Sequence, residues 1–144
     1  ISECLVGSEM CIRDRFHIGH LNMFKRAKEQ CRYLIVGVVS DEGVRLNKQA
    51  EPFVPFDERI EMVRSCKYVD EAIKLPLDFC GTRDMFKIYH FDVQFSGSDY
   101  EHDPAWLAEK EFLEKNGSTM VFFPYTQSTS STKLKKAIEN RINN

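Results

Sequence analysis

A continuous apolar run from Tyr33 to Val39 (YLIVGVV) constrains the fold of this chain more than any other segment. The run is rich in β-branched residues and does not alternate with polar ones, which is typical of a strand buried on both faces of a parallel sheet. Shorter runs of the same kind, each after a helical pattern, follow at 68–73, 93–96 and 119–123. This alternation of helices and strands predicts an α/β fold built on a doubly wound parallel sheet.

Capping residues and apolar spacing predict where the first helices lie. The first helix is expected to begin near Leu21, and its apolar side is formed by Leu21, Phe24, Ala27 and Cys31. Asp57 is a suitable cap for a second helix that ends near Cys66, and a third helix is expected over 82–89.

Two later helices and one loop carry similar signals. Asp103 stands before a proline, a combination that begins helices, and Gly117 stands where that helix should end. The last helix is expected to begin at residue 130 or 131 and to face inward with Leu134, Ala137 and Ile138. The segment 46–56 contains two prolines and has no periodicity, so it is predicted to be a loop.

The composition is that of a single globular domain. The chain has 144 residues, of which 42% are hydrophobic and 29% are charged, and such a chain is long enough to bury a core. A net charge of -2 argues against a broad nucleic-acid surface. Five cysteines without a C-x-x-C pair fit a reducing compartment, and no apolar run approaches the roughly 20 residues that span a bilayer. We therefore expect a cytoplasmic domain that neither binds nucleic acid nor inserts into a membrane.

Two histidines with a glycine between them, His17-Ile18-Gly19-His20, stand at the start of the first predicted helix. A helix start exposes unpaired N–H groups and the positive end of the helix dipole, so it suits a phosphate. Gly19 lets the backbone approach a ligand closely, and the two imidazoles, one turn apart, can point into the same anionic pocket. The motif predicts a nucleotide site. The alternatives are a structural pair of capping histidines and a metal site, which would need a third ligand.

Further short motifs follow the histidines along the chain: Val39-Ser40-Asp41-Glu42, Glu58-Arg59, Tyr68-Val69-Asp70-Glu71, Gly97-Ser98-Asp99 and Ser130-Ser131-Thr132-Lys133. In order and spacing this set resembles the cytidylyltransferase family, most closely the glycerol-3-phosphate cytidylyltransferases, over residues 16–138. The resemblance implies a Rossmann-like fold and transfer of a cytidylyl group from CTP to a small alcohol phosphate, with glycerol 3-phosphate as the leading acceptor. It also implies Mg²⁺ as a cofactor and a homodimer.

The same resemblance assigns roles to individual residues. It makes His17, His20 and Lys48 the catalytic residues, with Lys48 reaching the phosphates from a mobile loop. It places in the nucleotide site Asp14, Phe16, Gly19, Arg59, Asp99, Thr126, Ser130, Ser131 and Thr132, with Asp14 also as a ligand of Mg²⁺. Simpler interpretations stay open: a solvated loop lysine at 48, a surface ion pair of Arg59 with a glutamate, a turn aspartate at 99 and ordinary caps at 130–132.

Residues 1–15 depart from the family pattern. Family members begin with a central strand that ends in Gly-Thr-Phe-Asp, whereas Cys11-Ile12-Arg13-Asp14 stands in that place here. The segment has no clean period and looks like translated adapter DNA joined to a gene fragment. We therefore interpret 1–15 as foreign to the nucleotidyltransferase domain formed by 16–144. A sheet without its central strand loses ladder hydrogen bonds on both sides, so such a chain should be poorly stable or inactive.

The function inferred from these motifs has two rivals. In the late family signature, Tyr125 and Ser128 replace an arginine and a glycine, and the contacts that select the base are not evident from sequence. The first rival is another H-x-G-H nucleotidyltransferase that uses ATP, or acts on phosphocholine, phosphoethanolamine or a pentitol phosphate. The second is an inactive nucleotide-binding module that lacks the first strand.

Overall fold

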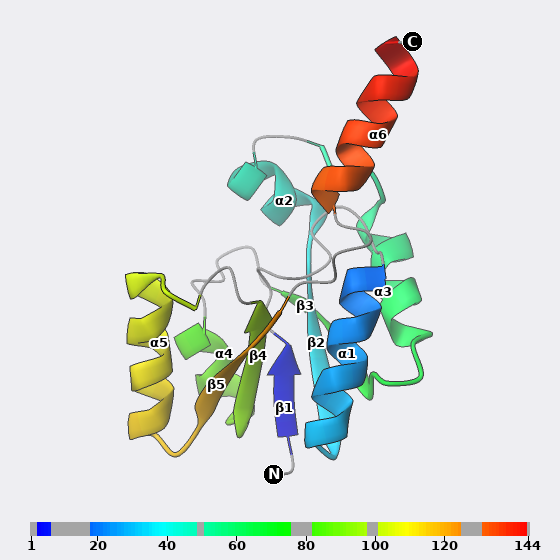
Figure 1. The fold of residues 1–144 in the computed structure, drawn as a ribbon. Coiled ribbons are helices and arrows are strands. Elements are labelled where there is room, and N and C mark those ends of the chain that lie inside the picture. The colour runs from blue at the N-terminus through cyan, green and yellow to red at the C-terminus, as the bar shows by residue number, and fades with distance from the viewer. Residues whose placement is uncertain are drawn as a thin grey trace.

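Five parallel strands form one sheet at the centre of the molecule (Figure 1). This computed structural model describes residues 3–6, 18–48, 51–75, 82–97, 101–124 and 131–143. The strands are β1 (Glu3–Val6), β2 (Tyr33–Val39), β3 (Glu71–Leu75), β4 (Val93–Gly97) and β5 (Thr119–Phe123), and they lie in the order β3-β2-β1-β4-β5. The predicted α/β class with a doubly wound parallel sheet is confirmed.

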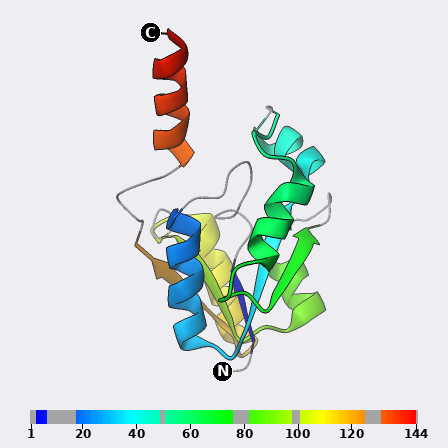
Figure 2. The ribbon, with the colours of Figure 1, turned by 90° about the vertical axis from the view of Figure 1, so that its right-hand side faces the viewer.

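Helices cover both faces of the sheet. They are α1 (Ile18–Gln30), α2 (Asp41–Lys48), α3 (Phe56–Arg64), α4 (Thr82–Tyr89), α5 (Pro104–Lys115) and α6 (Ser131–Asn143). Helices α1 and α3 pack on one face and α4 and α5 on the other (Figures 1 and 2). The bounds of α4 are as predicted, and α5 has the predicted cap, because the Asp103 side chain accepts a hydrogen bond from the Ala105 N–H at 2.8 Å.

Strand β2 contributes to the core on both of its faces, which explains its continuous apolar sequence. Leu34, Val36 and Val38 pack with the side chains of α1 and α3, and Ile35 and Val39 pack with those of α4 and α5. All five are buried. Because side chains alternate along a strand, a strand covered on both faces needs apolar residues at successive positions. This double-sided core fixes the carboxyl ends of the strands, from which the loops of the candidate site emerge.

Strand β1 is the central strand of the sheet and pairs with β2 on one side and β4 on the other. Leu5 lies level with Ile35 and with Gln94 in these two ladders. The expectation that the central strand is missing is therefore wrong. That expectation looked for the strand directly before the histidine motif, at 11–14, whereas the apolar residues Cys4-Leu5-Val6 supply it earlier in the chain. Residues 7–17, which lead from β1 to α1, lie outside the described part.

Three local predictions also need correction. Ala137 is exposed and Ile138 is 39% exposed, because α6 projects away from the body of the molecule (Figures 1 and 2). Helix α2 extends to Lys48, into the segment predicted to be a loop, and the Ser40 Oγ caps its start by accepting a hydrogen bond from the Gly43 N–H at 3.1 Å. The N-cap of α3 is Pro55 rather than Asp57, which lies in the first turn.

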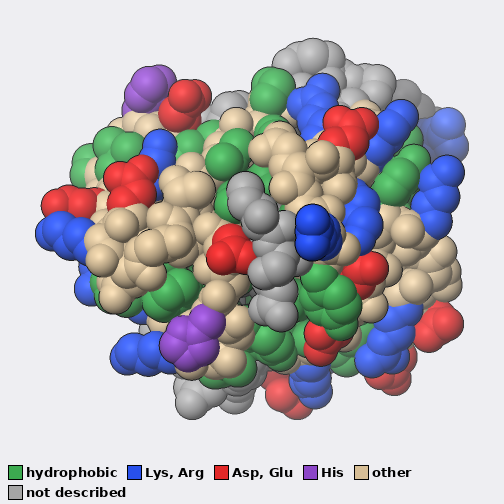
Figure 3. Space-filling model, turned by 90° about the horizontal axis from the view of Figure 1, so that it is seen from below, with side chains coloured by type: hydrophobic (Ala, Val, Ile, Leu, Met, Phe, Trp, Pro, Cys, Tyr) green, Lys and Arg blue, Asp and Glu red, His purple; other side chains and the backbone are tan. Residues whose placement is uncertain are grey.

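The amino ends of the strands form the face opposite to the candidate site, where charges of both signs are mixed (Figure 3). Near this end Asp70 accepts hydrogen bonds from Lys28 of α1 and, at 2.7 Å, from the Leu34 N–H of β2. Partial burial raises the pKa of Asp70, but the hydrogen bonds and the positive charge of Lys28 outweigh it and hold the pKa below its ordinary value. The carboxylate therefore stabilises the fold where α1 ends and β2 begins.

We expect Asp70→Asn to lower the free energy of unfolding by about 1 kcal/mol at pH 7, because the amide oxygen still accepts from the Leu34 N–H but lacks the charge that strengthens this hydrogen bond and pairs with Lys28. A depressed pKa in the folded state stabilises the protein above the ordinary pKa of about 4. That contribution is lost as the pH falls through the lower folded-state value. Urea unfolding from pH 7 to pH 3 should show the difference between wild type and variant shrinking below pH 4, and a constant difference would contradict this account.

Candidate functional site

The order of the strands places a topological switch point beside β1. From β1 the chain proceeds to β2 and then β3 on one side of the sheet, and it later adds β4 and β5 on the other side. The helices that follow β1 and β4, α1 and α5, therefore lie on opposite faces of the sheet, and in open α/β sheets ligands bind in the crevice beyond the carboxyl ends of the strands at such a point. The candidate site is expected at this edge of the sheet.

Helix α1 begins at this edge with part of the predicted histidine motif. It starts at Ile18 rather than near Leu21, so Gly19 and His20 lie in its first turn. His20 is 8% exposed and lies on the buried side of α1 with Met23 and Phe24. The imidazole is therefore directed toward the inside of the molecule at the start of the helix, where unpaired N–H groups and the positive end of the dipole also lie.

The start of α6 lies at the same edge. Figures 1 and 2 both show the N-terminal ends of α1 and α6 turned toward each other. Ser131 and Thr132 are the first residues of α6, so the predicted hydroxyl-bearing helix start faces the histidine-bearing one. Two positive helix ends that face each other favour a multiply charged anion such as a triphosphate.

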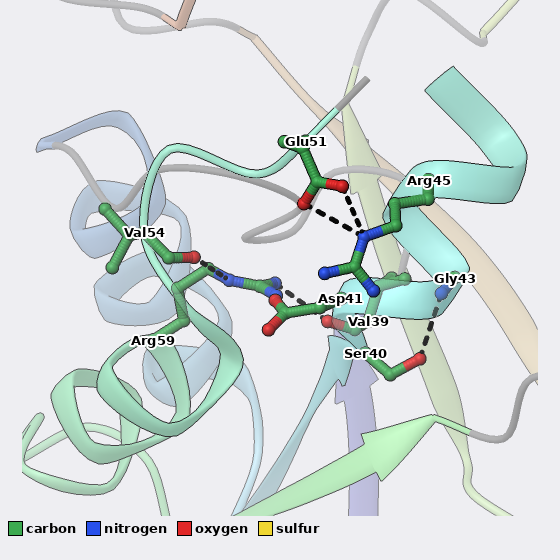
Figure 4. A network of polar contacts seen from close by, with 8 residues as sticks. All are labelled: Val39, Ser40, Asp41, Gly43, Arg45, Glu51, Val54 and Arg59. Carbon is green, nitrogen blue, oxygen red and sulfur yellow. Dashed lines mark hydrogen bonds and ion pairs between the residues drawn. The ribbon is translucent and has the colours of Figure 1, made fainter. Parts of the chain in front are cut away.

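Helix α2 is joined to α3 through one buried arginine (Figure 4). The Arg59 Nη1 donates a hydrogen bond to the Val39 carbonyl at 2.8 Å, and Nη2 donates to the Asp41 Oδ1 at 2.6 Å. The Nε donates to the Val54 carbonyl at 2.8 Å. The side chain of Arg59 is 0% exposed. The guanidinium therefore contacts the end of β2, the start of α2 and the segment before α3 at once.

These contacts bear on the two interpretations of Arg59 made from the sequence, of which its place in the nucleotide site stays a prediction. A surface ion pair with a glutamate is excluded by the burial of the side chain and by its pairing with Asp41. The exposed ion pair in this region joins Arg45 to Glu51, at 2.8 Å, and the hydrogen bond and charge of Glu51 raise the pKa of Arg45 above its ordinary value. A bound phosphate would reach Arg59 only by displacing the groups that bury it.

Several predicted site residues are not placed by the structure. Outside the described part are Asp14, Phe16, His17, Asp99, Thr126 and Ser130. Lys48 is the last residue of α2. Within the described residues, no group of three His, Cys, Asp or Glu side chains is arranged to hold a metal ion. Sequence analysis quoted Ser40 and Asp41 in a family motif but gave them no role, although a serine at the end of a buried strand, followed by two acidic residues, is a recognisable signal for a helix start.

Two buried polar side chains of β4 lie beside the switch point. Among the described residues, no hydrogen-bond partner is found for the Gln94 Oε1 and the Ser96 Oγ, and both residues are at most 1% exposed. They alternate with Val93 and Phe95, which pack toward α1 and α3, so they face the layer of α4 and α5. An unpaired buried polar group costs about 1–3 kcal/mol, so these side chains lower the stability of the fold.

We expect the double variant Gln94→Met, Ser96→Ala to raise the free energy of unfolding by about 1–2 kcal/mol, because it removes both unpaired groups and keeps similar volumes. Denaturant unfolding of the wild type, both single variants and the double variant measures this. A loss of stability in Ser96→Ala would show that a bound water or another group satisfies the hydroxyl in solution.

Comparisons with known proteins decide the family. A family model described as cytidylyltransferase-like matches residues 14–137. The chain belongs to this family. It is a nucleotidyltransferase, as are the relatives named below. Among the described residues of this family member, no helix is long and apolar enough to cross a membrane.

The relatives of this cytidylyltransferase-like chain carry different names. It is 36% identical to the FAD synthase of Thermococcus kodakarensis over 134 residues, which cover 90% of this chain and 86% of the relative. It is 30% identical to the glycerol-3-phosphate cytidylyltransferase of Bacillus subtilis, with 87% and 90% covered. It is 39% identical to the ethanolamine-phosphate cytidylyltransferase of Dictyostelium discoideum, but it spans 36% of that protein.

A solved structure resembles the fold of this family member. The lipopolysaccharide core biosynthesis protein from Thermoplasma volcanium GSS1 superimposes with a TM-score of 0.65 and 22% identity, over 90% of this chain and 98% of the other. At that identity the likeness concerns the fold alone. The predicted homodimer and cytoplasmic location stay predictions.

Proposed function

We propose that the chain transfers a cytidylyl group from CTP to a small alcohol phosphate, with glycerol 3-phosphate as the leading acceptor. The observation that carries the proposal is the pair of facing helix starts at the switch point, one bearing His20 and the other Ser131 and Thr132. This arrangement provides N–H donors and positive dipole ends on two sides of an anion. The name of the Bacillus subtilis relative, which is of similar length, supports the choice of acceptor.

In the proposed reaction, an oxygen of the acceptor phosphate attacks the α-phosphorus of CTP. The new bond joins that oxygen to the α-phosphorus, and the bond from the α-phosphorus to the oxygen bridging toward the β-phosphorus breaks with both electrons. Pyrophosphate leaves and a CDP-alcohol forms. The acceptor phosphate has a second pKa near 6, so at neutral pH it is largely a dianion and needs no strong general base.

The protein then has to position the two phosphates in line and to stabilise the charge that develops at the α-phosphorus. His17 and His20 donate hydrogen bonds to the α-phosphate oxygens, and the start of α6 binds the rest of the triphosphate through backbone N–H groups and hydroxyls. Lys48 at the end of α2 brings a positive charge to the phosphates. Phe16, Asp99 and Thr126 complete the nucleotide site in this proposal.

Mg²⁺ belongs to the proposal as a cofactor that neutralises charge on the triphosphate when bound. The ion is usually held by one or two carboxylates together with phosphate oxygens and water, so Asp14 alone would be a sufficient contribution from the protein. Asp14 lies outside the described residues, and no step above passes through the metal.

A second candidate is adenylyl transfer from ATP. It is favoured by the 36% identity to a FAD synthase of similar length, since FAD is formed from a flavin mononucleotide half and an adenylyl half. The helix starts would bind the triphosphate of either nucleotide in the same way. The two candidates differ in the contacts to the base and the acceptor.

Pyrophosphate release tests these proposals directly. The purified chain with Mg²⁺ should be assayed with CTP or ATP, each against glycerol 3-phosphate, phosphoethanolamine, phosphocholine, a pentitol phosphate and flavin mononucleotide. We expect release with CTP and glycerol 3-phosphate and recovery of a CDP-alcohol. Release with ATP and the flavin, but not with CTP, would replace the first candidate by the second. No release in any combination would contradict both.

A further inference from the structure

One buried side chain holds both ends of the segment that contains α2. Val39 and Asp41 lie at the entrance to α2, and Val54 lies at its exit, just before α3. The guanidinium of Arg59 donates hydrogen bonds to all three, at 2.8, 2.6 and 2.8 Å (Figure 4). The described parts of this segment, 40–48 and 51–54, are thus linked at their far ends to one group that belongs to another helix.

Away from the hydrogen bonds of Arg59, the ion pair and several apolar side chains of this segment are exposed to solvent. Arg45 and Glu51 form an ion pair whose side chains are 48% and 73% exposed, and such pairs contribute little. Leu46 is 67% exposed and Phe53 is 56% exposed. The buried anchors lie at the start of α2, where Val44 is 1% exposed and the Ser40 cap is formed. The direction of α2, and so the position of its last residue Lys48, is therefore determined near Arg59.

We propose that Arg59 is a positioning residue that sets the orientation of α2 and thereby places Lys48 at the nucleotide, and that it does not itself bind phosphate. This inference rests on the proposed function, because the role of Lys48 belongs to that function. The burial of Arg59 separates it from a ligand. Its side chain is 0% exposed, and its Nε, Nη1 and Nη2 atoms each donate a hydrogen bond to an acceptor of the protein.

The geometry also shows why lysine cannot take this role. The three acceptors are a carboxylate and two carbonyls that belong to different segments, and a guanidinium reaches them at once because its five donors have a fixed, planar arrangement. An ammonium is a compact charge that would bind one or two of them. Arg59→Lys therefore keeps the charge but loosens the link between the two ends of the segment.

The kinetic test compares Arg59→Lys and Asp41→Asn with wild type in pyrophosphate release. We expect kcat to fall by about 10- to 100-fold, as for a catalytic group displaced by about 1 Å, with KM for the nucleotide changed by less than about threefold. In a Lys48→Met background the same substitutions should lower kcat by less than about twofold, since there is no lysine left to position. Arg83→Lys is the matched control, because Arg83 forms an exposed pair with Glu109 on the opposite face of the sheet.

A full effect of Arg59→Lys in the Lys48→Met background, or a rise in KM without a fall in kcat, would overturn the inference in favour of a direct contact with phosphate. Asp41→Asn keeps the test valid if Arg59→Lys does not fold, because it removes one acceptor charge and leaves the arginine in place. Melting temperatures of all variants ensure that activity is compared between folded proteins.

Hydrogen exchange provides a second arm that does not depend on activity. We expect the α2 amides of Asp41→Asn and Arg59→Lys to exchange at least about tenfold faster than those of wild type, while the β2 amides keep their protection. Unchanged exchange in α2 would overturn the inference even in an active enzyme. If wild type releases no pyrophosphate from any nucleotide, the proposed function fails and the role assigned to Lys48 fails with it, whereas faster exchange would still establish that Arg59 anchors α2.

Discussion

Leu5→Pro should unfold the domain at 25 °C. Leu5 lies in β1, the central strand, whose backbone pairs with β2 on one side and β4 on the other. Proline removes a ladder N–H, and its ring collides with the neighbouring strand, at a cost of about 3 kcal/mol or more. The total stability of a domain is about 5–15 kcal/mol, and here the damage separates the two halves of the sheet. Circular dichroism during thermal unfolding should show no cooperative transition, or one shifted down by more than about 15 °C.

Leu5→Val is the matched control, because it keeps the N–H, has an apolar side chain whose β-branching suits a strand, and should unfold within a few degrees of wild type. Deletion of residues 1–15 tests the same point from another direction, since the truncated chain lacks β1. If the truncated chain melts like wild type, then β1 is not part of the folded domain in solution, and the interpretation of 1–15 as foreign sequence would be supported. The structure predicts instead that truncation abolishes the transition.

The elements that sequence analysis recovered are those whose signals are local. The bounds of β2, β5 and α4 are as predicted, and the start of α5 follows from an aspartate cap before a proline. Strand β1 was missed because the run at 3–6 is too short to show a periodic pattern of apolar residues. It forms a strand by pairing with β2 and β4, which lie far along the chain. For α6, periodicity identified the apolar positions Ala137 and Ile138, but whether another element covers them depends on tertiary packing.

The same distinction applies to the candidate site. Gly19 and His20 were predicted at a helix start, and they lie in the first turn of α1 because the motif and the helix are adjacent in sequence. The surroundings of Arg59 could not be predicted from its position on α3. Its acceptors Val39 and Val54 lie far apart in the sequence, and only the tertiary structure brings both of them to the guanidinium. A buried arginine that joins two segments has no sequence pattern of its own.

Replacing both histidines of the motif should abolish turnover while leaving the fold largely intact. One preorganised donor to the transition state contributes about 10²–10³ in kcat, so His17→Ala and His20→Ala should each lower kcat by that factor. Because the two groups act on the same phosphate, the double variant should lose about 10³–10⁵ rather than the full product. The measurement is pyrophosphate release from CTP with glycerol 3-phosphate under saturating conditions.

His20 needs a more careful substitution than His17, because it is 8% exposed and packs on the same side of α1 as Met23 and Phe24. Alanine there also leaves a small cavity, so His20→Asn, which retains a polar donor in a smaller side chain, separates loss of chemistry from loss of packing. His20→Asn should melt closer to wild type than His20→Ala and should recover part of the lost kcat.

The exposed His102, in the turn before α5, provides the control His102→Ala, which should change neither the melting temperature nor kcat. Turnover of the His17→Ala, His20→Ala double variant within about twofold of wild type would mean that the facing helix starts do not hold the reacting phosphate, and the proposed chemistry would have to be placed elsewhere on the molecule.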